Sequence, residues 1–137
     1  MTPPATCGKL RIARANSRGR VLVVDDEVLV CWALATGLRQ AGFSTETASC
    51  AADAVHLARI VPQPDAVLLD SRMHDCDPAA LLRQLRAVAP DCRFLLMTTE
   101  RHEAPTPPDD VLIVRKPFDL IDVVQQVAAE VVRAQAS

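Results

Sequence analysis

Three aspartates, a threonine and a lysine stand at the ends of apolar runs in this sequence. Asp25 and Asp26 follow one run, Asp70 ends a second, and two later runs end at Thr98 and Lys116. In an open parallel α/β sheet, ligands bind beyond the carboxyl ends of the strands. If the runs are strands of such a sheet, the carboxylates, the hydroxyl and the amine meet at one edge.

This set of groups suits a divalent metal and a phosphoryl group. Two carboxylates roughly 4 Å apart repel by about 4 kcal/mol at an effective dielectric of 20, so a cluster of three favours a bound cation. Oxygen donors favour Mg²⁺, with Mn²⁺ as a second candidate. An aspartate can accept a phosphoryl group, while a lysine and a hydroxyl stabilise the phosphoryl oxygens. We therefore expect phosphoryl-transfer chemistry at this edge.

The elements that must position these groups alternate as in a parallel sheet covered on both faces. Short apolar runs predict strands over 21–24, 43–47, 66–69, 93–97 and 111–114. Helices are predicted over 27–41, 50–60, 79–88 and 120–134. The expected fold is α/β, a three-layer, doubly wound, five-stranded parallel sheet. Prolines interrupt residues 99–110, so the helix between the last two strands should be truncated or replaced by a proline-rich loop.

Several polar residues and glycines predict where the helices begin and end. Gly42 is a natural stop for the first helix, and Ser49 is the expected N-cap of the second. Asp77 precedes Pro78 and should cap the third helix, and Asp119 should cap the last.

The last helix carries more apolar residues than one face needs. Its expected inward stripe consists of Ile121, Val124, Ala128 and Val131. Val123 and Val127 fall off that line. They favour either a dimer face or an extension of the core.

Length and composition indicate one domain of 137 residues, with no apolar run near the roughly 20 residues of a membrane span. Residues 1–20 carry five basic side chains and no acid, whereas the rest carries ten basic against seventeen acidic side chains. We expect a flexible basic tail over 1–18 and a domain over 19–135. Its acidic balance argues against a nucleic-acid partner. Five cysteines without C-x-x-C spacing indicate a soluble, cytoplasmic protein with reduced thiols.

The sequence resembles the receiver domain of response regulators, the CheY-like, flavodoxin-like domains of bacterial two-component signalling. The resemblance runs from about Arg20 to Arg133. Four motifs carry it in order: the acidic pair in Val24-Asp25-Asp26-Glu27, the segment Leu69-Asp70-Ser71-Arg72-Met73, the pair Met97-Thr98, and Lys116-Pro117-Phe118. Each motif alone is weak, but together, with Asp26 and Asp70 separated by 44 residues, they are specific.

The resemblance implies a role for each residue of the site. Asp70 would be the phosphoryl acceptor. Mg²⁺ would be held by Asp25, Asp26, Asp70 and the main-chain carbonyl of Arg72. Lys116 would pair with the phosphoryl oxygens, and Thr98 would hydrogen-bond one of them. Lysine is a rare choice in this chain, which has thirteen arginines and two lysines, and this supports a specific role for Lys116.

Three positions depart from the family's pattern, and two more lie where family members tune the lifetime of the phosphoryl group. Ile113 stands where an aromatic switch residue is usual, and Thr99 stands where a small residue is common. We hypothesise that Arg72 and Glu100 form an ion pair that hinders attacking water, although both are also compatible with solvated charges. His74 replaces a common proline; we expect an exposed side chain, with metal ligation as the alternative.

The expected function is that of a phosphoacceptor in a phosphorelay, which promotes its own phosphorylation and dephosphorylation but is not an enzyme with small-molecule turnover. The expected partners are a histidine kinase or histidine phosphotransfer protein, an output protein yet to be identified, and a second copy of the chain. In the family the first helix docks the kinase, so Trp32 is either core or, if exposed, a binding anchor. Two alternatives stay open: a pseudo-receiver that binds without phosphorylation, and a metal-dependent phosphatase.

Overall fold

The computed structural model describes residues 17–99 and 110–136. Its strands are β1 (Arg20–Val24), β2 (Ser44–Ala48), β3 (Ala66–Asp70), β4 (Arg93–Thr98) and β5 (Val111–Arg115). Its helices are α2 (Val28–Gln40), α3 (Ala51–Arg59), α4 (Pro78–Val88) and α5 (Leu120–Ala136). Every expected strand and helix is present, and the bounds differ from the prediction by one or two residues.

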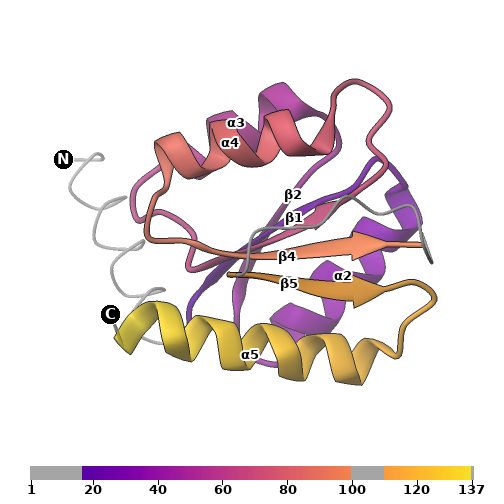
Figure 1. Ribbon diagram of the computed structural model, residues 1–137. Helices are drawn as coiled ribbons and strands as arrows, with labels where there is room; N and C mark the ends of the chain where they lie inside the picture. The colour runs from indigo at the N-terminus through magenta and orange to yellow at the C-terminus, as the bar shows by residue number, and fades with distance from the viewer. Residues whose placement is uncertain (1–16, 100–109, 137) are drawn as a thin grey trace, which may run out of the picture.

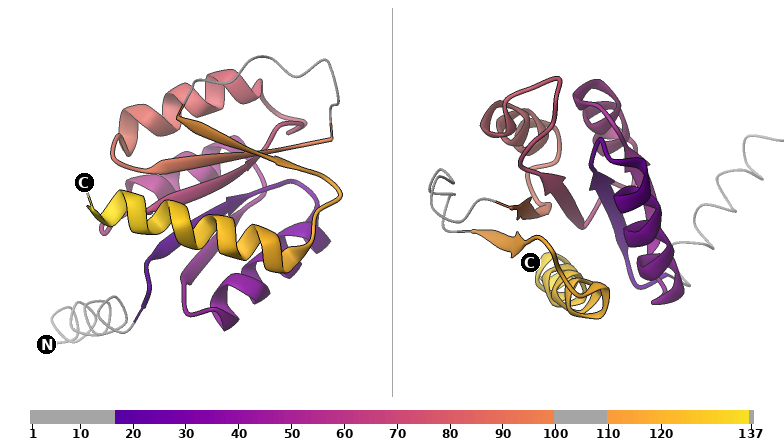
Figure 2. Two further views of the ribbon diagram at one scale, coloured as in Figure 1. Left: turned by 60° about the horizontal axis from the view of Figure 1, so that its bottom comes forward. Right: turned by 90° about the vertical axis from the view of Figure 1, so that its right-hand side faces the viewer.

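The strands form one parallel sheet in the order β2-β1-β3-β4-β5. Helices α3 and α4 cover one face, and α2 and α5 cover the other, so the fold has three layers (Figure 1). The two further views show α5 lying across the second face beside α2 (Figure 2). This confirms the predicted doubly wound α/β fold. The strand order reverses between β1 and β3, the place where such sheets bind ligands.

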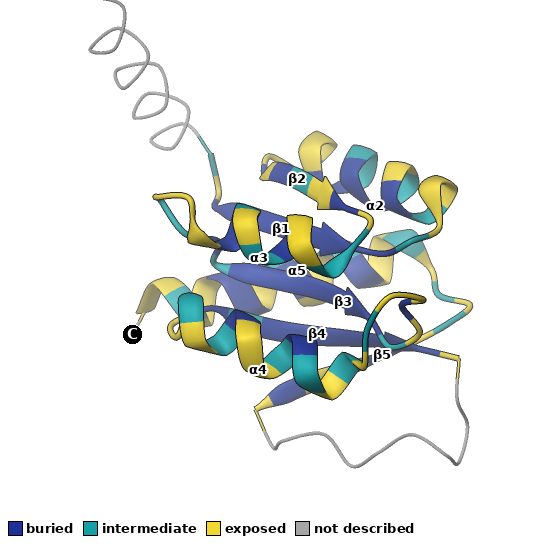
Figure 3. Ribbon diagram, turned by 90° about the horizontal axis from the view of Figure 1, so that it is seen from above, coloured by how far each residue is buried: buried dark blue, intermediate teal, exposed yellow. Residues whose placement is uncertain are grey.

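The hydrophobic core is divided between the two faces of the sheet. On one face, Leu22, Leu69 and Phe94 pack with buried residues of α3 and α4. On the other, Leu68 and Leu95 pack with buried residues of α2 and α5. The inner strands β1, β3 and β4 are buried along nearly their whole length, and the exposed residues of the helices face outward (Figure 3). A sheet covered on both faces explains why the strands read as continuous apolar runs.

Most of the predicted helix boundaries are confirmed. Gly42 follows α2 with a φ of 101°, a backbone conformation that favours glycine. The Asp77 side chain accepts a hydrogen bond from the backbone N–H of Ala80, as expected for an N-cap. The expected cap at Ser49 is wrong, because the N-cap residue of α3 is Cys50. The first turn of α3 is instead satisfied from a distant loop, where Asp75 Oδ2 accepts from the N–H of Ala51 at 2.9 Å.

The expected inward face of α5 is wrong in part, because Val131 is buried as predicted but the centre of the buried face is rotated about the helix axis away from Ile121. Ile121 is 66 % exposed, whereas Val123 and Val127 lie in the core with Val131. Val124 is partly buried at the edge of this cluster. Val123 and Val127 therefore pack against the sheet and supply no dimer face.

Of the two alternatives for Trp32, packing in the core is wrong and exposure is confirmed. Its side chain is 66 % exposed on α2, next to the exposed Val28 and Leu29. Leu34 and Leu38 form the inward face of that helix, as predicted.

A buried arginine holds the opposite end of the sheet, where the strands begin. Arg20 is 6 % exposed, and its guanidinium bonds to Glu46 on the neighbouring strand β2. The same group donates to the main-chain carbonyls of Leu57, Ile60 and Pro62, which belong to the end of α3 and the loop that follows it. A buried arginine with this many acceptors is fully compensated and fixes the loop to the sheet.

Two expectations cannot be compared with the described residues. Residues 100–109 lie outside them, and with these the proline-rich segment and the Arg72–Glu100 ion pair. Most of the expected tail, residues 1–16, also lies outside. Within the described ranges, no helix is both long and apolar enough to cross a membrane.

Candidate functional site

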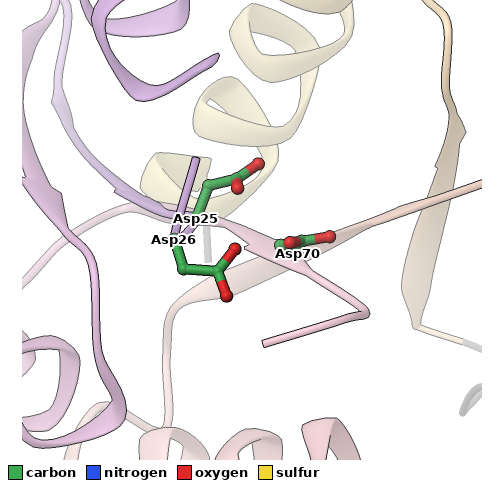
Figure 4. Close-up of side chains that lie close together, drawn as sticks. All are labelled: Asp25, Asp26 and Asp70. Carbon is green, nitrogen blue, oxygen red and sulfur yellow. The ribbon is translucent and has the colours of Figure 1, made fainter. Parts of the chain in front are cut away.

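Three aspartates meet at the carboxyl ends of β1 and β3. Asp25 and Asp26 directly follow β1, and Asp70 is the last residue of β3, which pairs with β1 in the sheet. One carboxylate oxygen of each lies within 4.8 Å of the others (Figure 4). Asp25 and Asp70 are buried, and Asp26 is partly exposed. The sheet therefore brings together the acids that the sequence predicted.

Among the described residues, Lys116 supplies the positive charge nearest to the two buried acids. It follows β5, and its Nζ lies 3.0 Å from Oδ2 of Asp25 and 3.5 Å from Oδ1 of Asp70. Glu27 lies on the outer side of the same ammonium, at 3.5 Å. The Lys116–Pro117 peptide bond is cis. Lys116 thus bridges the two buried carboxylates, one of which the sequence predicts to be the phosphoryl acceptor.

The remaining predicted residues lie around Asp70. Thr98 is buried as the last residue of β4, the strand next to β3. Its carbonyl accepts a hydrogen bond from the N–H of Lys116 at 2.8 Å. The N–H of Arg72 donates to Oδ1 of Asp70 at 3.3 Å, which starts the turn after β3. The structure therefore gathers all of the predicted residues at one edge, while the phosphoacceptor, metal-binding and phosphoryl-binding roles assigned to them stay predictions.

His74 contacts an acid that Lys116 does not reach in the described part of the site. Its backbone N–H donates to Oδ2 of Asp26 at 3.0 Å, and its ring Nδ1 contacts the same oxygen. The ring is 89 % exposed. The predicted exposure is confirmed, but the side chain is not isolated, because it covers one oxygen of the acidic cluster.

Burial and charge shift the pKa values of the site in different directions. Burial, then the charge of Asp25, raises the pKa of the Asp70 carboxyl. The hydrogen bond with His74 lowers the pKa of Asp26 and raises that of His74. Burial opposes the charge of Lys116, but its hydrogen bond to Asp25 and the nearby carboxylates raise its pKa overall. Because the pKa of Asp70 is raised and that of Asp26 is lowered, Asp70 is the more basic of the two, and higher basicity favours nucleophilic attack.

Comparison with known proteins decides the family. The family model described as "Response regulator receiver domain" matches residues 21–128, which contain all of the site residues above. The chain belongs to the response regulator receiver domain family. It is 36 % identical over 121 residues to the transcriptional regulatory protein PrrA of Mycobacterium leprae, covering 82 % of this chain and 50 % of that protein. The regulatory protein AtoC of Escherichia coli is 37 % identical over 79 residues, which covers 58 % of this chain and 17 % of that protein. The chain thus spans half or less of the length of these relatives.

Solved receiver structures share the fold at low sequence identity. The receiver domain of the hybrid histidine kinase CckA superposes with a TM-score of 0.72 at 24 % identity, covering 82 % of this chain and 99 % of that chain. A CheY-like receiver protein of Methanospirillum hungatei gives a TM-score of 0.74 at 17 % identity, covering 85 % and 96 %. These structural similarities support the receiver fold, and they carry no information about partner proteins.

The acidic edge of this receiver fits a hard divalent cation. Three carboxylates from two strands converge, and two of them are buried, which is costly without a compensating positive charge. Among the described residues, the side chains of Lys116 and His74 contact these acids. The backbone N–H groups of Glu27 and Arg72 also donate to Asp25 and Asp70. All three candidate ligands are oxygen donors, the type that Mg²⁺ and Mn²⁺ prefer.

A pocket of about 380 Å³ lies beside the acids of the receiver, between α2 and the end of β2. Asp25 lines it from the site, Trp32 and Cys31 line it from α2, and Asp53 lines it from α3. Burial raises the pKa of the Cys31 thiol to about 11, and its Sγ lies 3.0 Å from the carbonyl oxygen of Asp25. Trp32 therefore belongs to the surroundings of the acidic site.

Two contacts of the site were missed from the sequence. The sequence places Glu27 in the acidic motif, but its contact with Lys116 is not among the predictions. Its position directly after two acids could have indicated that it also lies near the lysine. The contact between His74 and Asp26 had no signal, because it depends on the path of the loop after β3.

Proposed function

We propose that this receiver accepts a phosphoryl group on Asp70 from a phosphohistidine of a partner protein. The observation that carries the proposal is the arrangement of Asp70 between Lys116, at 3.5 Å, and the acidic pair at the end of β1. A carboxylate of raised pKa, a nearby ammonium and an oxygen-donor metal site are the parts that phosphoryl transfer to an aspartate requires.

The proposed transfer is a single displacement at phosphorus, in which one bond forms as another breaks. An oxygen of Asp70 attacks phosphorus, a P–O bond forms, and the P–N bond to the donor imidazole breaks. The electron pair of that bond stays on the imidazole nitrogen, which takes up a proton. Lys116 holds an oxygen of the phosphoryl group, and the Thr98 hydroxyl donates to another. Lys116 Nζ lies 3.5 Å from Asp70, and Thr98 follows Met97, the residue of β4 that pairs with Asp70.

Asp25, Asp26, Asp70 and the main-chain carbonyl of Arg72 would hold Mg²⁺ or Mn²⁺. When bound, the cation neutralises charge on the carboxylates and on the phosphoryl oxygens. The chain's own contribution is to hold Asp25 and Asp70 away from bulk water at the ends of β1 and β3, with Asp26 partly exposed beside them. The same edge would promote loss of the phosphoryl group to water, which makes the domain a self-resetting signal and not an enzyme with small-molecule turnover.

The exposed first turns of α2 are the part of the surface that best suits the phosphohistidine donor. Val28, Leu29 and Trp32 project from the helix that begins directly after the acidic pair. A tryptophan that becomes buried when a partner binds is a common energetic anchor of protein interfaces. A kinase or phosphotransfer protein that packs there would bring its histidine to Asp70.

Phosphorylation would signal through altered protein contacts. It adds about −1.5 to −2 charges beside Lys116 and Thr98, which biases the surface near β4 and β5 toward a second state. The proposed domain covers 19–135, acts in the cytoplasm and passes its signal to an output protein. The relative PrrA is named as a transcriptional regulatory protein, so the acidic balance argues against nucleic acid only for the receiver itself.

Intact-mass spectrometry tests the proposal directly. The chain is incubated with acetyl phosphate and Mg²⁺, beside Asp70→Asn and beside Asp91→Asn, an exposed aspartate away from the site. We expect a gain of one phosphoryl mass in the wild type and in Asp91→Asn, and none in Asp70→Asn. A folded wild type that gains no mass contradicts the proposal and favours the pseudo-receiver. Turnover of a soluble phosphate ester in a parallel incubation, without a protein adduct, would favour a phosphatase.

A further inference from the structure

The acids of the site are divided between two different donors. Lys116 contacts Asp25 and Asp70, the two buried carboxylates. Asp26, the partly exposed one, is contacted by His74. The ring of His74 is therefore the side-chain partner of Asp26, as Lys116 is the side-chain partner of Asp25 and Asp70.

Both donors of His74 converge on one oxygen of Asp26. The backbone N–H lies 3.0 Å from Oδ2, and ring Nδ1 touches the same atom. The backbone contact fixes the orientation of the carboxylate, because it belongs to the turn that follows β3. The ring contact is additional, and it comes from a side chain that is 89 % exposed and thus able to move away.

The ring is not placed as a ligand of the same ion. Among the residues that the structure describes, the group whose candidate ligand atoms all lie within 4.8 Å of one another contains Asp25, Asp26 and Asp70, and it does not include His74. The ring approaches this group at Asp26, its partly exposed member, and covers Oδ2, one of the two carboxylate oxygens that Asp26 could offer to an ion.

We propose that the His74 ring competes with the divalent cation for Asp26 and so lowers the affinity of the receiver for Mg²⁺. This inference rests on the proposed function, because it assumes that the three aspartates are the metal site. Replacing the ring removes the competing donor. The backbone N–H of residue 74 stays and continues to orient the carboxylate, so the ligand is freed without being lost.

The inference gives His74 a specific role in the cycle of the receiver. At low Mg²⁺ the ring occupies Asp26, and the acidic edge is incomplete for phosphoryl transfer. At high Mg²⁺ the ion displaces the ring. The residue therefore sets the concentration of Mg²⁺ above which Asp70 becomes reactive.

Isothermal titration with Mg²⁺ alone tests this without any measure of activity. Four variants are compared with the wild type at one pH: His74→Ala, His74→Asn, His56→Ala and Asp26→Asn. His74→Asn keeps a side-chain N–H near the position of ring Nδ1. His56 is an exposed histidine on α3 and serves as the matched control.

We expect His74→Ala to bind Mg²⁺ about twofold to tenfold more tightly, the range set by the net worth of one hydrogen bond. His74→Asn and His56→Ala should bind as the wild type does, and Asp26→Asn should bind more weakly. Phosphorylation by acetyl phosphate should be faster in His74→Ala at subsaturating Mg²⁺ and equal at saturation.

The outcomes separate this inference from the proposed function. Equal or weaker binding by His74→Ala, with normal binding by the wild type and loss in Asp26→Asn, overturns the inference alone. It would mean that the ring orients Asp26 or does not affect the ion. No Mg²⁺ binding by the folded wild type, or binding unaffected in Asp26→Asn, overturns the metal site and with it both proposals.

Discussion

Lys116 is the residue on which the charge balance of the buried acids depends. Its ammonium lies between Asp25 and Asp70, and its side chain is 13 % exposed. Two buried carboxylates without a cation repel each other and lose hydration, and removing one partner of a buried ion pair is strongly destabilising. Lys116 thus contributes to folding as well as to the proposed chemistry.

Lys116→Met should lower the free energy of unfolding by about 3 kcal/mol in the absence of divalent cations. Added Mg²⁺ should restore part of that loss and should stabilise the variant more than the wild type, because the ion supplies the missing charge and binding to the native state stabilises it. Urea unfolding with and without Mg²⁺ measures both effects. Arg83→Met, an exposed cation on α4, is the control and should change little. A variant as stable as the wild type without Mg²⁺ would contradict this account.

At this scale the sequence was informative where strand ends decide the position of a residue. Asp25, Asp70 and Thr98 could be placed together because parallel strands end at the same edge. The contact of His74 with Asp26 could not be predicted, because no periodicity describes the path of a seven-residue loop between β3 and α4.

At the scale of elements, α2 separates stability from recognition on its two faces. Leu34 and Leu38 are buried against the sheet, while Trp32 is exposed beside the acidic pocket. Burial of a leucine stabilises the fold, whereas an exposed tryptophan contributes little to folding and offers area to a partner.

Leu34→Ala should therefore lower the free energy of unfolding by about 2–5 kcal/mol, and Trp32→Ala by less than about 0.5 kcal/mol.

Trp32→Ala should also slow phosphoryl transfer from a phosphorylated histidine phosphotransfer protein, but not from acetyl phosphate, which needs no docking surface. Mass spectrometry of both reactions distinguishes the effects. Equal loss with both donors would show that Trp32 supports the site and not a partner.

The helix faces show what periodicity leaves undecided. On α5, the stripe through Ile121 and the stripe through Val123 are both apolar, and the sequence favoured the wrong one. Which stripe faces the sheet depends on how α5 packs beside α2, where Leu120 would lie within 3.2 Å of a Cβ added to Gly37. Such a close approach between two helices is a tertiary property. The existence of the helix was predictable and its rotation was not.

Across the whole molecule, the two ends of the sheet have different tasks. The carboxyl ends carry the three aspartates, Thr98 and Lys116. The aspartates repel one another and attract Lys116, and Asp70 is proposed to accept the phosphoryl group. The amino ends carry Arg20, whose guanidinium joins β1 to β2 and to the loop after α3. Gly19 adds to this end, because a Cβ there would lie 2.6 Å from Val131 of α5. The strands are long enough to keep these two sets of contacts apart, so stability and chemistry can be changed separately.

Arg20→Lys tests this separation. Lysine keeps the charge but has neither the planar fork nor enough donors for Glu46 and the three carbonyls, so buried acceptors are left unpaired. We expect the free energy of unfolding to fall by about 2 kcal/mol, measured by urea unfolding. The Mg²⁺ affinity and the rate of phosphorylation by acetyl phosphate should stay within about twofold of the wild type, because no contact of Arg20 reaches the described acidic edge. If the variant lost Mg²⁺ affinity while still folded, the two ends of the sheet would be coupled through β1, and the acidic edge would depend on the contacts of Arg20 at the other end.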